Sequence, residues 1–129
     1  MEGVNKLLKV KKILPCILLA CLLCSCEKDY LVPESELPQW LKTSIKQDEK
    51  AIEENLKGGA ALGAWIRTRW DEAYFYEYHN LLLSSMPRPI SHGGDTLDLW
   101  VGDIHTDYHK EKCCVVYVWK GPDYIEIFD

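Results

Sequence analysis

The sequence lacks an apolar run long enough to cross a membrane. Its clearest apolar run, residues 13–23, has eleven positions and is interrupted by Pro15, whereas a membrane-spanning helix needs roughly 20 apolar residues. Four lysines and one glutamate precede this run, and small residues follow it. A cationic segment, a short apolar core and a small-residue end predict a secretory signal peptide over residues 1–25.

Several common catalytic signatures are also missing. The chain has no Gly-x-Ser-x-Gly nucleophile elbow, no phosphate-binding glycine loop and no dinucleotide-binding fingerprint. His92-Gly93-Gly94-Asp95 is similar to the glycine loop of an esterase oxyanion hole, but without the elbow it predicts only a turn before Thr96. No cofactor is expected from these motifs.

Positive charge is scarce beyond the first segment. The whole chain has a net charge of −5, and the part from Cys26 onward holds 11 basic and 19 acidic residues, a net charge of −8. Such a surface repels nucleic-acid phosphates and attracts cationic partners. Nucleic acid is therefore not an expected partner.

Four of the six cysteines lie within residues 16–26. The stretch Leu23-Cys24-Ser25-Cys26 resembles the lipobox of bacterial lipoproteins, in which an aliphatic residue precedes the acceptor cysteine by three positions and a small residue directly precedes it. Cys21 also fits the pattern, but apolar chain follows it. Polar chain follows Cys26 at once, which favours Cys26 as the acceptor.

The resemblance implies that Cys26 carries a diacylglyceryl thioether and, after cleavage, an acylated amine. The chain would then be held in a bacterial cell envelope, as an outer-membrane lipoprotein, by acyl chains on Cys26. The following Glu27-Lys28-Asp29 resembles the export tag of surface-exposed lipoproteins but has one acid where two are preferred, so both a periplasmic and a surface-facing position stay open. A cleaved secreted protein and an uncleaved hydrophobic hairpin are the alternatives.

The remainder divides into a tether and one domain. Residues 26–35 contain Pro33 and little periodic pattern, which predicts a lipidated tether. Residues 36–129 then form a single small domain. Apolar residues recur on one face between residues 37 and 56, which predicts an amphipathic helix that Pro38 helps to begin and Gly58-Gly59 ends.

Beyond Gly63 the hydrophobic period becomes two. Residues 65–70 and 74–78 predict a hairpin, and residues 113–119 predict the strongest strand, followed by a turn and a strand over residues 124–128. Residues 81–83 and 96–101 are further strand candidates. The expected fold class is α+β, with one N-terminal amphipathic helix packed on an antiparallel sheet of about five or six strands.

Cys113 and Cys114 are the thiols that remain after signal cleavage and lipidation. Adjacent side chains of a strand point to opposite faces, and a bond between neighbours needs a distorted ring. The sequence therefore favours two small apolar residues in a core strand. A bond to a partner chain and a bond between the two cysteines stay open.

One segment has the residue types of a metal site. Asp103, His105, Asp107 and His109 recur at every second position, and in a helix the two histidines would still lie one turn apart on one face, a spacing that can chelate zinc. No glutamate lies between the histidines to act as a base. A solvated connection is the alternative.

Aromatic residues are the other lead. If Tyr74, Tyr76 and Tyr78 share an exposed face with Arg67 and Arg69 nearby, they form a flat platform for a sugar ring, a peptide or a protein. The alternative is that these rings fill the core of a small domain.

The domain loosely resembles small lipoproteins of gut anaerobes. The likeness rests on the lipobox, on Leu37-Pro38-x-Trp40-Leu41-Lys42 and on Tyr76-Glu77-Tyr78, and it implies a location without an activity. We expect a non-enzymatic, lipid-anchored module that binds an envelope protein or glycan. The alternatives are an inhibitor of a cationic hydrolase and a small metal-dependent hydrolase that uses the segment from Asp103 to His109.

Overall fold

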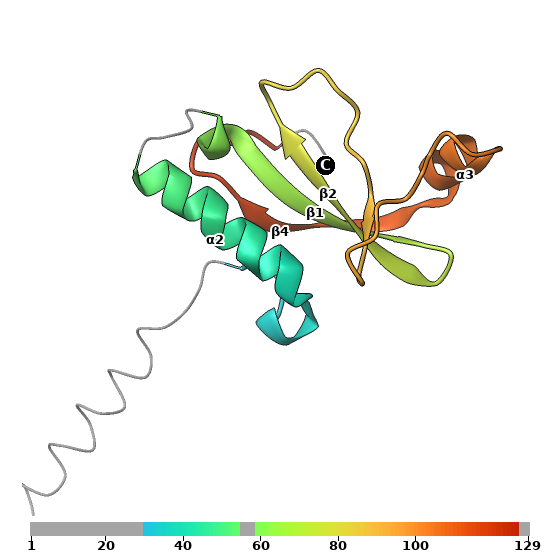
Figure 1. Cartoon of the computed structure of the whole chain (residues 1–129), viewed down its shortest axis with the longest axis horizontal. Helices are drawn as coiled ribbons and strands as arrows, with labels where there is room; N and C mark the ends of the chain where they lie inside the picture. Colours follow the sequence, from blue (N-terminus) through green and yellow to red (C-terminus); the bar gives the residue numbers. More distant parts are fainter. Residues whose placement is uncertain (1–29, 55–58, 127–129) are drawn as a thin grey trace, which may run out of the picture.

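The computed structural model describes residues 30–54 and 59–126 of the chain. In order, these residues form the short 3-10 helix η2 (Glu34–Glu36), helix α2 (Gln39–Glu53), the 3-10 helix η3 (Ala60–Leu62), strands β1 (Gly63–Trp70), β2 (Ala73–Asn80) and β3 (Ile90–Ser91), helix α3 (Ile104–Glu111) and strand β4 (Cys113–Lys120). The strands form one antiparallel sheet in the order β3-β2-β1-β4 (Figure 1).

Strands β1 and β2 form a hairpin at the centre of the sheet, and the two-residue hydrophobic period predicted this hairpin. Its register runs without a break from Gly63 opposite Asn80 to Trp70 opposite Ala73. A two-residue loop, Asp71-Glu72, joins the strands, and both residues have positive φ values of 49° and 60°. This is the geometry that two-residue hairpin turns require, normally supplied by Asn-Gly or Asp-Gly.

Replacing this loop by Asn-Gly is expected to stabilise the domain by about 1 kcal/mol, because a side chain in the left-handed region costs about that much and glycine avoids the cost. Urea unfolding of Asp71→Asn/Glu72→Gly against the parent measures it. Glu72→Ala is the control and should be nearly neutral, since alanine keeps the backbone cost. A destabilised Asn-Gly variant would contradict the turn assignment.

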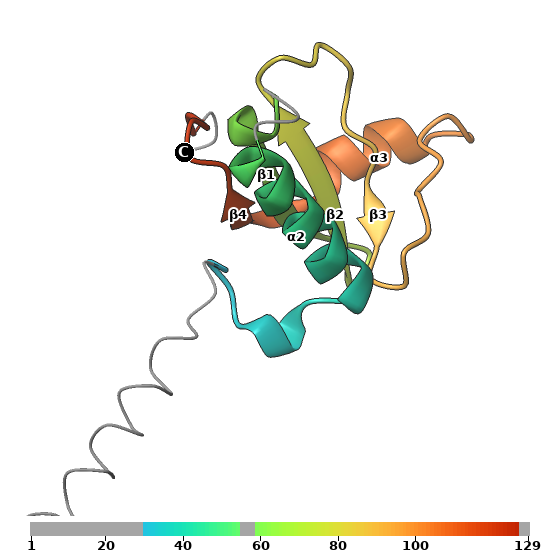
Figure 2. The same ribbon diagram turned by 60° about the vertical axis from the view of Figure 1, so that its left-hand side comes forward.

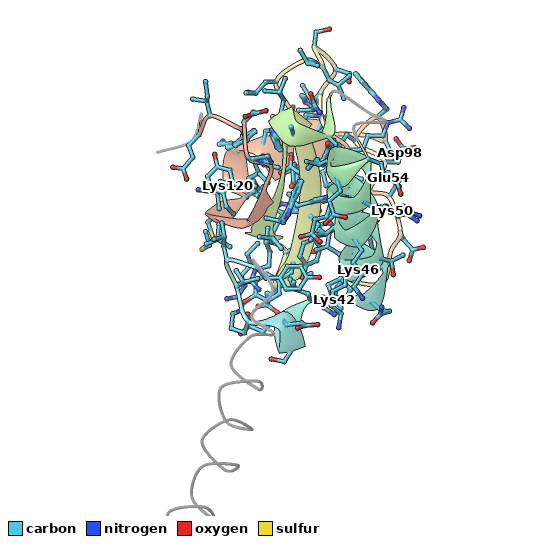
Figure 3. All side chains as sticks on the ribbon, turned by 90° about the vertical axis from the view of Figure 1, so that its left-hand side faces the viewer. Lys42, Lys46, Lys50, Glu54, Asp98 and Lys120 are labelled. Atoms are coloured by element: carbon cyan, nitrogen blue, oxygen red, sulfur yellow. A yellow bond between two sulfur atoms is a disulfide. The ribbon has the colours of Figure 1, made fainter. Side chains whose placement is uncertain are left out.

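One face of the sheet is covered by α2. Leu41 and Ile45 of this helix are fully buried against Trp65, Tyr76 and other core residues, which confirms the predicted apolar stripe. The helix begins one residue after Pro38 and ends at Glu53. The sequence predicted a longer helix, but Leu56 and Gly58 at its expected end lie outside the described residues. The lysines at positions 42, 46 and 50 follow its outer surface (Figure 3).

Helix α3 covers part of the opposite face (Figure 2). Its Tyr108 is fully buried and packs with Phe75 of β2 and Leu99 in a second, smaller core cluster. The α+β class with an antiparallel sheet is confirmed. The finer expectation is wrong: the described residues form two α-helices and four strands instead of one helix and five or six strands, and the main helix, which begins at residue 39, is not at the N-terminus of the chain.

Three expected strands are absent from the described residues. Residues 81–83 form a turn and an extended loop with exposed leucines, and Thr96 contributes only an isolated bridge to Ile90. Residues 124–126 are not in a strand, and 127–128 lie outside the description. Apolar and β-branched residues predicted strands here, but strand propensity depends on a neighbouring strand to pair with.

The folded domain starts earlier than residue 36. Tyr30 and Val32 pack against the core cluster under α2, and the Leu31 amide donates a hydrogen bond of 2.9 Å to the Val118 carbonyl of β4. Residues 30–35, assigned to the tether from their irregular composition, therefore belong to the domain. The sequence placed the start of the domain too late because residues 30–35 contain too few apolar side chains to show a hydrophobic period.

Candidate functional site

The expected tyrosine platform lies mostly under α2. Tyr74, Tyr76 and Tyr78 do share one face of β2, but Tyr76 is fully buried and Tyr78 is half-buried. The Trp40 ring of α2 packs edge-on against Tyr76, with 5.8 Å between ring centroids. Burial raises the pKa of Tyr76 and Tyr78. The expectation of three exposed rings is wrong. The alternation that places the three rings on one face of β2 places them on the face that α2 covers.

The arginines are divided in the same way. The Arg67 guanidinium lies 4.3 Å from the centre of the Tyr74 ring and 3.0 Å from the Glu36 carboxylate, and its side chain is largely buried. Arg69 and Tyr74 remain exposed, and they pair with each other near the Asp71-Glu72 turn of the β1–β2 hairpin. Two of the five expected residues are therefore available for contact, which is too small a surface for a platform.

The glycine turn has a packing role. Trp40 Nε1 donates a hydrogen bond of 3.0 Å to the His92 carbonyl, and the Cβ position of Gly94, whose φ is +94°, would lie 3.4 Å from the Trp40 ring. The predicted turn before Thr96 is confirmed. It holds the start of α2 against the sheet.

The residues of the expected metal site lie on α3 and just before it. Asp103 precedes the helix and Asp107 lies in its first turn, and both are exposed. His105 and His109 share one face, with 4.7 Å between ring centroids. Burial, together with positive charge on Lys112 and His105, lowers the pKa of His109, although Glu77 acts in the opposite direction. Over residues 30–54 and 59–126, no three His, Cys, Asp or Glu side chains converge as a metal site.

His105 instead joins two loops. Its ring stacks on Trp100, with centroids 5.9 Å apart, and its Nε2 atom lies 3.4 Å from Met86 Sδ. The histidine therefore links the loop that follows β2 to the loop that precedes α3.

A buried carboxylate is the feature that the sequence did not indicate. Glu77 of β2 is 1% exposed and points toward α3. It accepts hydrogen bonds from Tyr108 Oη at 2.9 Å and from Lys112 Nζ at 3.2 Å, and His79 Nε2 lies 3.7 Å from its other oxygen. Thr68 Oγ1 lies 2.9 Å from Tyr108 Oη. Since Tyr108 donates to the carboxylate, Thr68 donates to Tyr108 and completes a chain of buried polar groups.

The electrostatics of this network keep Glu77 ionised. Burial acts to raise the pKa of Glu77, but hydrogen bonds and charge from His79, Lys112 and Tyr108 outweigh burial and hold its pKa below the usual value. Burial and the adjacent carboxylate raise the pKa of Tyr108, which stays protonated as a donor. Because solvent does not reach the carboxylate, this network joins α3 to the sheet and offers no catalytic base.

A hollow of the surface adjoins these loops and lies between residues 85–88 and 96–100. This cleft has a volume of about 760 Å³, and Met86, Arg88, Leu97, Leu99 and Trp100 are among its lining residues. Its lining residue Trp100 is 82% exposed, and Leu82 in the loop that follows β2 is 66% exposed. Leu83, Met86 and Val101 are also exposed. We call the five exposed residues Leu82, Leu83, Met86, Trp100 and Val101 the loop surface.

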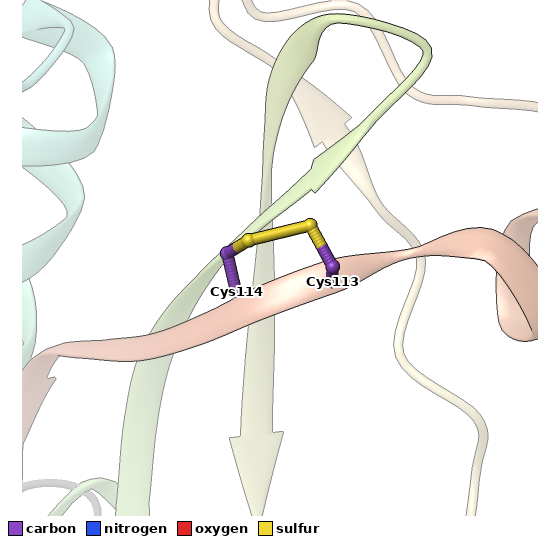
Figure 4. The surroundings of a disulfide bond; sticks show 2 residues. All are labelled: Cys113 and Cys114. Carbon is purple, nitrogen blue, oxygen red and sulfur yellow. A yellow bond between two sulfur atoms is a disulfide. The ribbon is translucent and has the colours of Figure 1, made fainter.

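Cys113 and Cys114 form a disulfide with each other (Figure 4). The expected core position is wrong, since both residues are exposed at the start of β4. Cys114 has a φ of +63°, and β4 holds an extra residue between the partners of Arg67 and Arg69. This bulge breaks the alternation of side chains along β4. The sequence disfavoured a bond between the two cysteines because a regular strand points neighbouring side chains to opposite faces, and β4 is not regular here.

Cys26 lies outside the described residues. None of the helices in residues 30–54 and 59–126 has the length and apolar character required to cross a bilayer. No protein-family model, curated protein or solved structure is significantly similar to this chain.

Proposed function

We propose that the chain is a lipid-anchored protein of the bacterial envelope, attached through acyl chains on Cys26, whose domain binds a protein partner through the loop surface. The observation that carries the binding role is the group of exposed apolar side chains on the two loops that border the cleft, with Trp100 and Leu82 the most exposed of those named. Exposed apolar side chains that gather on a protein surface are typical of interaction sites.

The position of the anchor supports this role. Only four peptide units separate Cys26 from Tyr30, a reach of at most about 14 Å. Tyr30 packs on the core under α2, and in Figures 1 and 2 the point where the chain enters the fold lies at the opposite end of the domain from α3 and the loop that follows β2. An anchor at Cys26 would therefore hold the entry end near the bilayer and leave the loop surface turned away from it.

A protein is favoured over a glycan as the partner. Sugar rings stack on flat aromatic faces, but one face of Trp100 is already stacked on His105, and the other members of the loop surface are leucine, methionine and valine. The net charge of −8 beyond the signal peptide favours a partner with basic residues around its own apolar patch. An inhibitor of a cationic hydrolase is one protein of this kind.

A hydrolase is less well supported. His105 contacts Trp100 and Met86, and the acidic residues Asp103 and Asp107 are exposed on and beside α3 without joining the two histidines in a ligand group over the described residues.

Site-directed photo-crosslinking in intact cells tests the loop surface. A photoreactive residue at Val101 is expected to give a discrete, protease-sensitive adduct, whereas the same residue at Lys46 on the outer side of α2 should give none. Adding Trp100→Ser should abolish the Val101 adduct while changing stability by less than about 0.5 kcal/mol, because an exposed side chain contributes little to folding.

Three results would contradict the proposal. One is the absence of an adduct at Val101, and a second is equal adducts at Val101 and Lys46. The third is an adduct removed by glycosidases and not by proteases, which would show that the partner is a glycan.

A further inference from the structure

We propose that the Cys113–Cys114 disulfide is a thiol–disulfide exchange site, whose reaction partner is a dithiol reductant. The proposal does not depend on the lipid anchor or on the loop surface. It rests on the exposure of the disulfide, on the backbone at Cys114 and on the position of Arg69.

Access is the first requirement for exchange. Cys113 and Cys114 are exposed at the beginning of β4, which is an edge strand of the sheet. The next two residues, Val115 and Val116, are exposed as well. The hydrogen bond from the Leu31 amide to the Val118 carbonyl lies farther along β4. A thiolate therefore reaches the disulfide without unfolding of the domain.

The backbone favours opening of the disulfide. Cys114 has a φ of +63°, a conformation that non-glycine residues adopt at a cost. A bond between adjacent residues constrains that backbone directly, since the two cysteines share one peptide unit. After reduction the constraint is gone, and Cys114 is free to return to an extended conformation.

Arg69 is an exposed cation on β1, the strand that pairs with β4. It lies opposite Cys113 in the ladder of β1 and β4, and side chains of directly paired residues share a face. A nearby guanidinium stabilises the thiolate that leaves when the disulfide is attacked, and it draws the incoming thiolate. Arg69, one of the two residues of the expected platform that remain exposed, would thus assist the exchange reaction.

The reaction balances as a two-electron exchange. A thiolate of the reductant attacks one sulfur of the pair, the Cys113–Cys114 bond breaks, and a mixed disulfide forms while the released cysteine takes a proton. The second thiol of the reductant then attacks the mixed disulfide, closes the reductant's own disulfide and frees the other cysteine. The protein gains two electrons and two protons, and the reductant loses the same.

The test measures the rate of reduction of the native, detergent-purified protein by dithiothreitol, with alkylation and peptide mass spectrometry to locate the new thiols. Before reduction, Cys113 and Cys114 should resist alkylation. With dithiothreitol both should become alkylated, at a rate that stays constant as urea rises toward the unfolding transition. A rate that rises in parallel with the unfolded fraction would overturn the proposal, as would alkylation of both cysteines before reduction.

Two variants test the role of Arg69. Arg69→Ala should slow reduction about two- to fivefold, the effect of an exposed charge interaction, and the loss should shrink at high salt. Arg88 is exposed and lies just before β3, the edge strand opposite β4, so Arg88→Ala should leave the rate unchanged. Equal rates for all three proteins would overturn the assignment of Arg69.

Discussion

Replacing Lys112 by methionine is expected to lower the free energy of unfolding by about 3 kcal/mol. The substitution leaves the Glu77 carboxylate buried without its cation, and breaking a buried ion pair from one side costs roughly 3–5 kcal/mol. The lower end of this energy range applies because the Lys112 side chain is still 20% exposed. Urea unfolding measures the change.

Lys110→Met is the matched control for this experiment. Lys110 lies on the same helix and is exposed, so its replacement should change the free energy of unfolding by less than about 0.5 kcal/mol. Equal effects of the two substitutions would contradict the account in which the Glu77 network joins α3 to the sheet.

The same network predicts a pH dependence. Because the folded-state pKa of Glu77 lies below its ordinary value of 4.5, the carboxylate contributes stability that is present above that value and is lost as the pH falls through the lower, folded-state pKa. As the pH falls below 4.5, the parent should therefore lose stability more steeply than Glu77→Gln, which has no charge to titrate. Parallel curves for the two proteins would show that Glu77 is not held ionised.

Replacing Cys26 by serine is expected to abolish incorporation of a fatty-acid label and to leave residues 1–25 attached. Serine lacks the thiol that forms the thioether, and in the family that this segment resembles, lipid attachment precedes cleavage. Each buried methylene contributes about 0.8 kcal/mol to membrane binding, and stable anchoring takes two chains. Metabolic labelling and the mass of the purified chain measure both effects.

Two neighbouring cysteines provide the controls. Cys24→Ser and Cys21→Ser keep the thiol of Cys26 and should be labelled and cleaved as in the parent. Loss of label in Cys21→Ser, with full label in Cys26→Ser, would move the acceptor to Cys21.

The parts of the fold with a strong hydrophobic period could be predicted from the sequence. The α2 stripe and the β1–β2 hairpin have long, regular patterns, and β4 is rich in valine and aromatic residues. Helix α3 could not be found in this way. It has eight residues, and of these Ile104 and Tyr108 alone supply a hydrophobic spacing of one turn. Asp103 before it is a typical helix-start residue and was the available signal.

The candidate sites were harder to predict because they depend on tertiary contacts. In the alternating stretch Tyr76-Glu77-Tyr78 the pattern assigns Glu77 to solvent, but α3 folds over that face and buries it. Tyr76 is in the core and Tyr78 packs against it because α2 occupies their face, while Tyr74 stays exposed. The Cys113–Cys114 bond requires a positive φ at Cys114 and a bulge in β4, neither of which a strand pattern contains.

The most direct test of the central claim is the mass of the first peptide of the mature protein, purified from the cell that makes it. The account predicts a chain that begins at Cys26 and carries the added mass of a diacylglyceryl group, with a further acyl chain on the amine. A chain recovered free in the medium with no fatty acid on its first residue would contradict it.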